Sequence, residues 1–139
     1  TFGALQNNLI TVYGGKQIRP NLTMYDMVKS YKFSLKRKFK KDRSIKNTVF
    51  NIGFENLSII NMAKRIQKTL KSFSKILIKP SNDPRSYRQN SNRIIKQGFK
   101  PTKKIEDAIL EIKEKNIKKK ITKKDKFYRI NTLKMINTK

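Results

Sequence analysis

The sequence lacks the residue types on which several common chemistries depend. Its 139 residues include no cysteine and no histidine. The chain therefore has no thiol nucleophile, no disulfide, no imidazole acid–base catalyst and no zinc site of the Cys/His type. No apolar run approaches the ~18 residues needed to cross a bilayer, and the first residues lack the basic start of a signal peptide. We expect a cytoplasmic protein without a bound metal.

Acidic residues are also scarce. The 9 Asp and Glu are outnumbered by 35 Lys and Arg, which gives a formal net charge of +26. Such a charge attracts polyanions, so composition alone favours a small basic nucleic-acid-binding protein, and this stands as the alternative hypothesis. Only 8 of the basic residues are Arg, the residue that makes bidentate contacts to guanine. A peripheral protein on anionic membranes ranks last, because no helix combines the Lys-rich runs with a strong apolar face.

Strand-type runs alternate with helix-type periodicity along the chain. Strands are predicted at Leu9 to Tyr13, Thr48 to Ile52 and Lys75 to Lys79, with a further extended stretch through Leu22 and Met24. Helices are predicted from Asp26, from the N-cap Ser58 to Leu70, from the N-cap Ser91 to the stop at Gly98, and from Ile105 to Lys115. This order predicts an α/β fold of a few short strands and about four helices. The strands are too few and too short for a complete doubly wound sheet, so we expect part of a larger protein.

Two apparent dehydrogenase motifs lack their required context. Tyr25 and Lys29 have the Tyr-x-x-x-Lys spacing, but they begin the helix from Asp26 with nothing of the expected site upstream. We interpret them as a partly buried Tyr and a solvated Lys. The Gly14-Gly15 turn lacks the spacing of a dinucleotide loop and leads to Pro20, which cannot directly open a helix. The chain therefore has no predicted catalytic or cofactor-binding residue.

Arg19 and Arg85 are the predicted anion-binding residues. Arg19 lies between the glycine turn and Pro20, and Arg85 lies in the Asp83-Pro84-Arg85-Ser86-Tyr87 loop. Both are on connections between elements, where binding residues are often found. A guanidinium suits phosphate because its planar fork makes two charge-assisted hydrogen bonds at once. The two residues form one site only if the fold brings them together.

The chain resembles the NAD-dependent epimerase/dehydratase family, the extended short-chain dehydrogenases that act on nucleotide sugars. The resemblance lies in four blocks in the family's order: Ile10 to Pro20 with the helix start Asp26-Met27-Val28, Phe50 to Gly53 with the Ser58 helix, Asp83 to Tyr87, and Arg93 to Ile109. These blocks match the C-terminal portion only. Residues 1–117 then correspond to a partial C-terminal substrate-binding region, and residues 118–139 to a basic tail with a short ordered patch at Phe127 to Ile130.

The resemblance implies an extended Rossmann-type parent enzyme, incomplete here without its N-terminal domain. That missing Rossmann domain would bind NAD(P) and carry the catalytic Tyr and Lys, and the parent is expected to be a homodimer. This chain would supply the binding region for a nucleoside-diphosphate sugar, with Arg19 and Arg85 on the substrate diphosphate. The parent would transiently oxidise the sugar, whereas this part alone is expected to be inactive. Neither the sugar nor the choice among epimerase, dehydratase and reductase follows from the residues.

Overall fold

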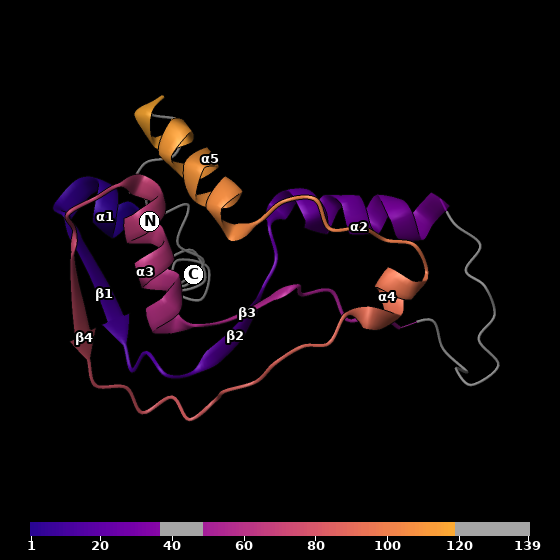
Figure 1. The fold of residues 1–139 in the computed structure, drawn as a ribbon, viewed down its shortest axis with the longest axis horizontal. Coiled ribbons are helices and arrows are strands. Elements are labelled where there is room, and N and C mark those ends of the chain that lie inside the picture. Colours follow the sequence, from indigo (N-terminus) through magenta and orange to yellow (C-terminus); the bar gives the residue numbers. More distant parts are fainter. Residues whose placement is uncertain (37–48, 119–139) are drawn as a thin grey trace, which may run out of the picture.

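The protein is of mixed α/β class. The computed structural model describes residues 1–36 and 49–118, where it shows five helices and four short strands. In chain order they are α1 (Phe2–Asn7), β1 (Leu9–Tyr13), β2 (Ile18–Asn21), α2 (Met24–Lys36), β3 (Glu55–Ser58), α3 (Ile59–Leu70), β4 (Lys75–Lys79), α4 (Asn92–Lys96) and α5 (Ile105–Ile117). The elements form an elongated molecule with β2 and β3 near its middle (Figure 1). The predicted strands at 9–13 and 75–79 are confirmed.

One region of the molecule, here called the aliphatic region, consists of α1, β1, α3, β4 and α5. Strands β1 and β4 pair in parallel, with Leu9 opposite Lys75 and Tyr13 opposite Lys79. Helix α3 connects β3 to β4 and packs its apolar face on this pair (Figure 1). The buried core is almost entirely aliphatic and consists of Ala4, Ile10, Val12, Ala63, Ile66, Leu70, Ile105 and Ile109.

Helix α3 shows why this region forms from the sequence. Its apolar residues recur at helical spacing, so Ala63, Ile66 and Leu70 fall on one buried face. Ser58 caps the helix, because its hydroxyl accepts a hydrogen bond from the Asn61 amide at 3.2 Å. Such a cap contributes about 1 kcal/mol. The predicted N-cap is confirmed, and Leu70, the last of the predicted apolar residues, is also the last residue of the helix.

The other region, here called the aromatic region, consists of α2, α4 and the segments 49–54 and 97–104. Phe99 is its centre, with the Phe33 ring edge-on at 5.4 Å and the Phe54 ring stacked at 5.6 Å between centroids. The side chain of Ile94 on α4 is fully buried beside them. Gly98 has a positive φ of 97°, and it ends the turn of α4 as predicted.

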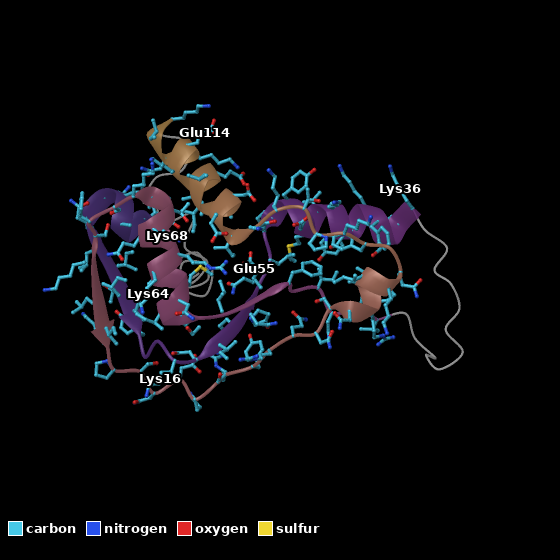
Figure 2. All side chains as sticks on the ribbon, viewed as in Figure 1. Lys16, Lys36, Glu55, Lys64, Lys68 and Glu114 are labelled. Atoms are coloured by element: carbon cyan, nitrogen blue, oxygen red, sulfur yellow. The ribbon has the colours of Figure 1, made fainter. Side chains whose placement is uncertain are left out.

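Strands β2 and β3 join the two regions. They pair antiparallel, with Ile18 opposite Ser58 and Asn21 opposite Glu55. Glu55 then connects β3 to two helices, since its carboxylate accepts from the Ile105 amide at the start of α5 at 2.8 Å and pairs with Arg65 on α3. Figure 2 shows Glu55 at this junction.

Several sequence predictions need correction. Residues 49–54 form no strand, and β3 begins only at Glu55. A strand exists through its ladder to a neighbour, whereas Gly53 is tied by its N–H and its carbonyl to the Ser91 hydroxyl, both at 2.9 Å. Because its hydroxyl is bonded to Gly53, Ser91 precedes α4 but makes no side-chain cap to it. The extended stretch through Met24 is also wrong, because α2 already begins there. Thr48 of the predicted strand and the predicted Phe127 to Ile130 patch lie outside the described residues.

Candidate functional site

Arg19 is held on β2 by contacts on both of its terminal nitrogens. Nη1 donates to the Ile18 carbonyl at 3.0 Å and to the Arg85 carbonyl, and Nη2 donates to Asp83 Oδ2 at 3.0 Å. The Tyr87 ring lies against the guanidinium, with its centroid 5.1 Å from Cζ. The side chain is only 21% exposed. Pro20, which keeps the preceding residue extended, fixes the backbone from which this side chain starts.

Arg85 reaches the same carboxylate from the loop between β4 and α4. Its Nε donates to Asp83 Oδ1 at 2.7 Å, its Nη2 donates to Oδ2 at 2.9 Å, and its backbone amide donates to Oδ1 at 3.1 Å. In contrast to Arg19, this side chain is 76% exposed. Arg85 therefore presents its guanidinium to solvent while one edge is bound to the protein.

Asp83 is the counter-ion of both guanidinium groups. The side-chain hydrogen bonds from Arg85, followed by the backbone hydrogen bond from the same residue, hold the pKa of the Asp83 carboxyl well below its usual range. The same pairing raises the pKa of Arg85. The carboxylate is therefore charged at any physiological pH and remains a hydrogen-bond acceptor for both arginines.

The loop that carries these residues is fastened to the two central strands. The Ile18 amide donates to the Ser86 hydroxyl at 3.0 Å, and the Tyr87 amide donates to the Ile18 carbonyl at 3.2 Å. Further along, Asn56 on β3 makes two hydrogen bonds to the backbone of Gln89, at 2.9 and 3.0 Å. The connection from β4 to α4 consequently runs along β2 and β3 (Figure 1). This fastening places Arg85 beside Arg19, although 66 residues separate them.

The structure thus brings the two sequence-predicted arginines into one cluster, but it gives them different parts. Both terminal nitrogens of Arg19 already donate to the protein, whereas the exposed Arg85 has donors directed away from Asp83. Asp83 and Tyr87 also belong to the cluster, and neither was predicted as a site residue. The Asp-Pro pair was the available signal for Asp83, since an Asp side chain in a turn often accepts a hydrogen bond from the backbone amide two residues on.

Nearby backbone amides do not add an anion-binding site. The first amides of α3 donate within the chain: Ile59 to the Gln17 carbonyl at 3.2 Å, Ile60 to the Gly15 carbonyl at 3.0 Å, and Asn61 to Ser58. The Gly14-Gly15 turn joins β1 to the strand β2 and not to a helix. The strand–turn–helix geometry of a dinucleotide site is therefore not formed at this turn.

The Tyr25 and Lys29 pair is not arranged for catalysis. Lys29 Nζ donates to the Lys100 carbonyl at 2.8 Å and to the Thr102 hydroxyl, on the chain that leads into α5. The Tyr25 ring is instead approached by Lys103, whose Nζ lies 5.9 Å from its centroid. The expected partly buried Tyr and solvated Lys need correction, because Tyr25 is exposed and Lys29 is bonded. The ammonium bonds to the chain entering α5, so nothing in this pair resembles a catalytic phenol with its Lys.

Two other classes of site were sought in the described part of the chain. Residues 1–36 and 49–118 contain no group of three or more acidic residues that could hold a metal ion. Within the same residues no helix combines the length and apolar character needed to cross a membrane.

Comparisons with known proteins give no family. A scan against protein-family models found no match, and a search of curated proteins found no significant match. The resemblance to epimerases and dehydratases therefore stays a prediction from the sequence blocks.

Proposed function

We propose that this chain is the nucleoside-diphosphate-sugar-binding part of an NAD-dependent epimerase/dehydratase. One observation carries the proposal: two arginines from distant parts of the sequence converge on Asp83 at the surface, as a shared diphosphate site requires. The four sequence blocks are the reason for proposing this family, and the cluster offers a place for the anionic part of the substrate.

The physical basis is charge-assisted hydrogen bonding. A diphosphate oxygen that replaces water at the exposed guanidinium of Arg85 gains contacts of about 1.5–3 kcal/mol each. Tyr87 and Arg19 would form the wall beside it, with Arg19 fixed in place by its protein contacts. The net charge of +26 draws anionic substrates toward the molecule. The nicotinamide chemistry would belong to the missing N-terminal domain, and a homodimeric parent belongs to the same proposal.

Removal of the Arg85 side chain tests the proposal. Isothermal titration calorimetry with uridine diphosphate should show binding to the wild-type chain, and Arg85→Ala should weaken this binding by at least tenfold. Uridine, which lacks the phosphates, should bind much more weakly to the wild-type chain. Lys64→Ala is the matched control, since it removes one positive charge from an exposed position on α3. Equal binding by Arg85→Ala and the wild-type chain would exclude this diphosphate site.

A nucleic-acid-binding function is the second candidate, and the distribution of lysines favours it. Lys64 and Lys68 lie one turn apart on α3 (Figure 2). Both are exposed, as are Lys71, Lys75 and Lys79 farther along, and the salt bridges within the described residues involve none of them. If this surface binds nucleic acid, a single-stranded oligonucleotide should bind at physiological salt, with affinity that falls steeply as salt rises. Lys64→Ala with Lys68→Ala would then weaken it, and Arg85→Ala would not.

A further inference from the structure

The carboxylate of Asp83 could act in either of two opposite ways at the proposed anion site. It accepts four hydrogen bonds, three from Arg85 and one from Arg19. As a negative charge, it repels a diphosphate and competes with it for the same donors. As a fixed acceptor, it holds an otherwise mobile Arg85 in one orientation.

The geometry at Arg85 separates these two roles. A guanidinium has five N–H donors in a planar fork. Asp83 takes the Nε–H and one N–H of Nη2, at 2.7 and 2.9 Å. The edge formed by Nη1 and the second N–H of Nη2 is left over, and it is the other edge that can bind an oxyanion with two parallel hydrogen bonds. The carboxylate and a ligand can therefore occupy different edges of one guanidinium.

We propose that Asp83 is a positioning residue that clamps the Nε–Nη2 edge of Arg85 and presents the Nη1–Nη2 edge to a diphosphate. The inference rests on the proposed function and adds a residue role to it. Arg19, Arg85 and Asp83 together carry one net positive charge, so the cluster attracts an anion even with the carboxylate in place. What Asp83 adds is order in a side chain that is 76% exposed. Ordering an exposed Arg before binding spares part of the conformational entropy that binding would cost.

The effect of Asp83→Asn on pyrophosphate affinity distinguishes the two roles. Affinity falls if Asp83 positions Arg85, and it rises if Asp83 competes with the ligand. The Asn keeps the shape but loses the charge and one acceptor oxygen of the bidentate contact. Titration of the chain with inorganic pyrophosphate should show binding roughly tenfold weaker for Asp83→Asn, because an unclamped Arg85 has to be ordered on binding. Asp107→Asn on α5 removes the same charge away from the loop and should leave the affinity within about twofold. Unchanged or tighter binding by Asp83→Asn would overturn the proposal.

A double-mutant cycle tests whether Asp83 acts through Arg85. Lysine has no Nε–Nη2 edge, so the loss caused by Asp83→Asn should disappear in the Arg85→Lys background. A merely structural role in the loop would leave the same loss in both backgrounds. That result would also contradict the proposal.

Side-chain NMR separates this proposal from the proposed function. The Arg85 Nε–H should give a resolved, exchange-protected signal in the wild-type chain that Asp83→Asn abolishes, with no ligand present. If pyrophosphate does not bind at all, the diphosphate function fails, and a protected Nε–H would still show the clamp. If pyrophosphate binds but the Nε–H is equally exposed to exchange in both proteins, only the clamp fails.

Discussion

Helices α2 and α3 are similar in length but bury opposite kinds of side chain. In the aliphatic region, α3 places its apolar residues on the core and its lysines in solvent. In the aromatic region, the two buried residues of α2 are polar, Asp26 and Ser30. Its apolar residues are largely exposed, to 68% at Met24 and 86% at Leu35. Helix α3 thus buries its apolar face in the core, whereas most apolar residues of α2 are exposed.

The two helices are held in place in different ways. Helix α3 is held by its buried apolar face, whereas α2 is held by hydrogen bonds and by the contact of Phe33 with Phe99. The Asp26 carboxylate accepts from the Thr102 and Lys103 amides at 2.8 to 3.0 Å, which ties α2 to the chain that enters α5. Met24, Val28, Tyr31 and Leu35 consequently form an exposed apolar row along α2.

The largest expected effect comes from the centre of the aromatic region. Phe99→Ala removes a buried ring that contacts Phe33 and Phe54, and such a truncation costs about 3–5 kcal/mol. Because the two cores share few contacts, we expect amide hydrogen exchange to accelerate in α2 and α4 while the amides of α3 and β1 stay protected. Equal loss of protection in both regions would show that they form one cooperative core.

An intermediate effect is expected from the polar anchor of α2. Asp26→Ala leaves the amides of Thr102 and Lys103 without their acceptor, at a cost of about 1.5–3 kcal/mol in unfolding free energy. Chemical denaturation followed by circular dichroism measures this change. Lys32→Ala, on the exposed side of the same helix, is the control and should change stability by less than about 0.5 kcal/mol. If the two variants are equally stable, the anchor contributes nothing.

Most of the fold was predictable because its signals are local. Short β-branched runs gave β1 and β4, and the spacing of Ala63, Ile66 and Leu70 gave α3 with its Ser58 cap. The failures have a common physical cause, which is that the outcome depended on a distant partner. Residues 49–52 have strand composition, yet Gly53 is bonded to Ser91, 38 residues away, and no ladder forms there. Periodicity also could not show that α2 would bury Asp26.

The two arginines of the candidate site could be predicted from the sequence, but the hydrogen bonds that bring them together could not. Arg19 and Arg85 could be selected because a rigid turn and a Pro-containing loop each hold one guanidinium. Their meeting depends on bonds from the loop to β2, such as Tyr87 to Ile18, which carry no sequence pattern. The same holds for the unequal roles of the two arginines, since exposure of 21% against 76% is set by packing.

We expect very little loss of stability at the exposed end of α2, where the contrast with α3 is most direct. Leu35→Ser changes a side chain that is 86% exposed, so little buried area is lost and the unfolding free energy should change by less than about 0.5 kcal/mol. Leu70→Ser, at the matching end of α3, buries a hydroxyl in an aliphatic core and leaves a cavity, at a cost of about 2–5 kcal/mol. Chemical denaturation of the two variants side by side measures the contrast. A large loss for Leu35→Ser would mean that the apolar side of α2 is already covered within this chain.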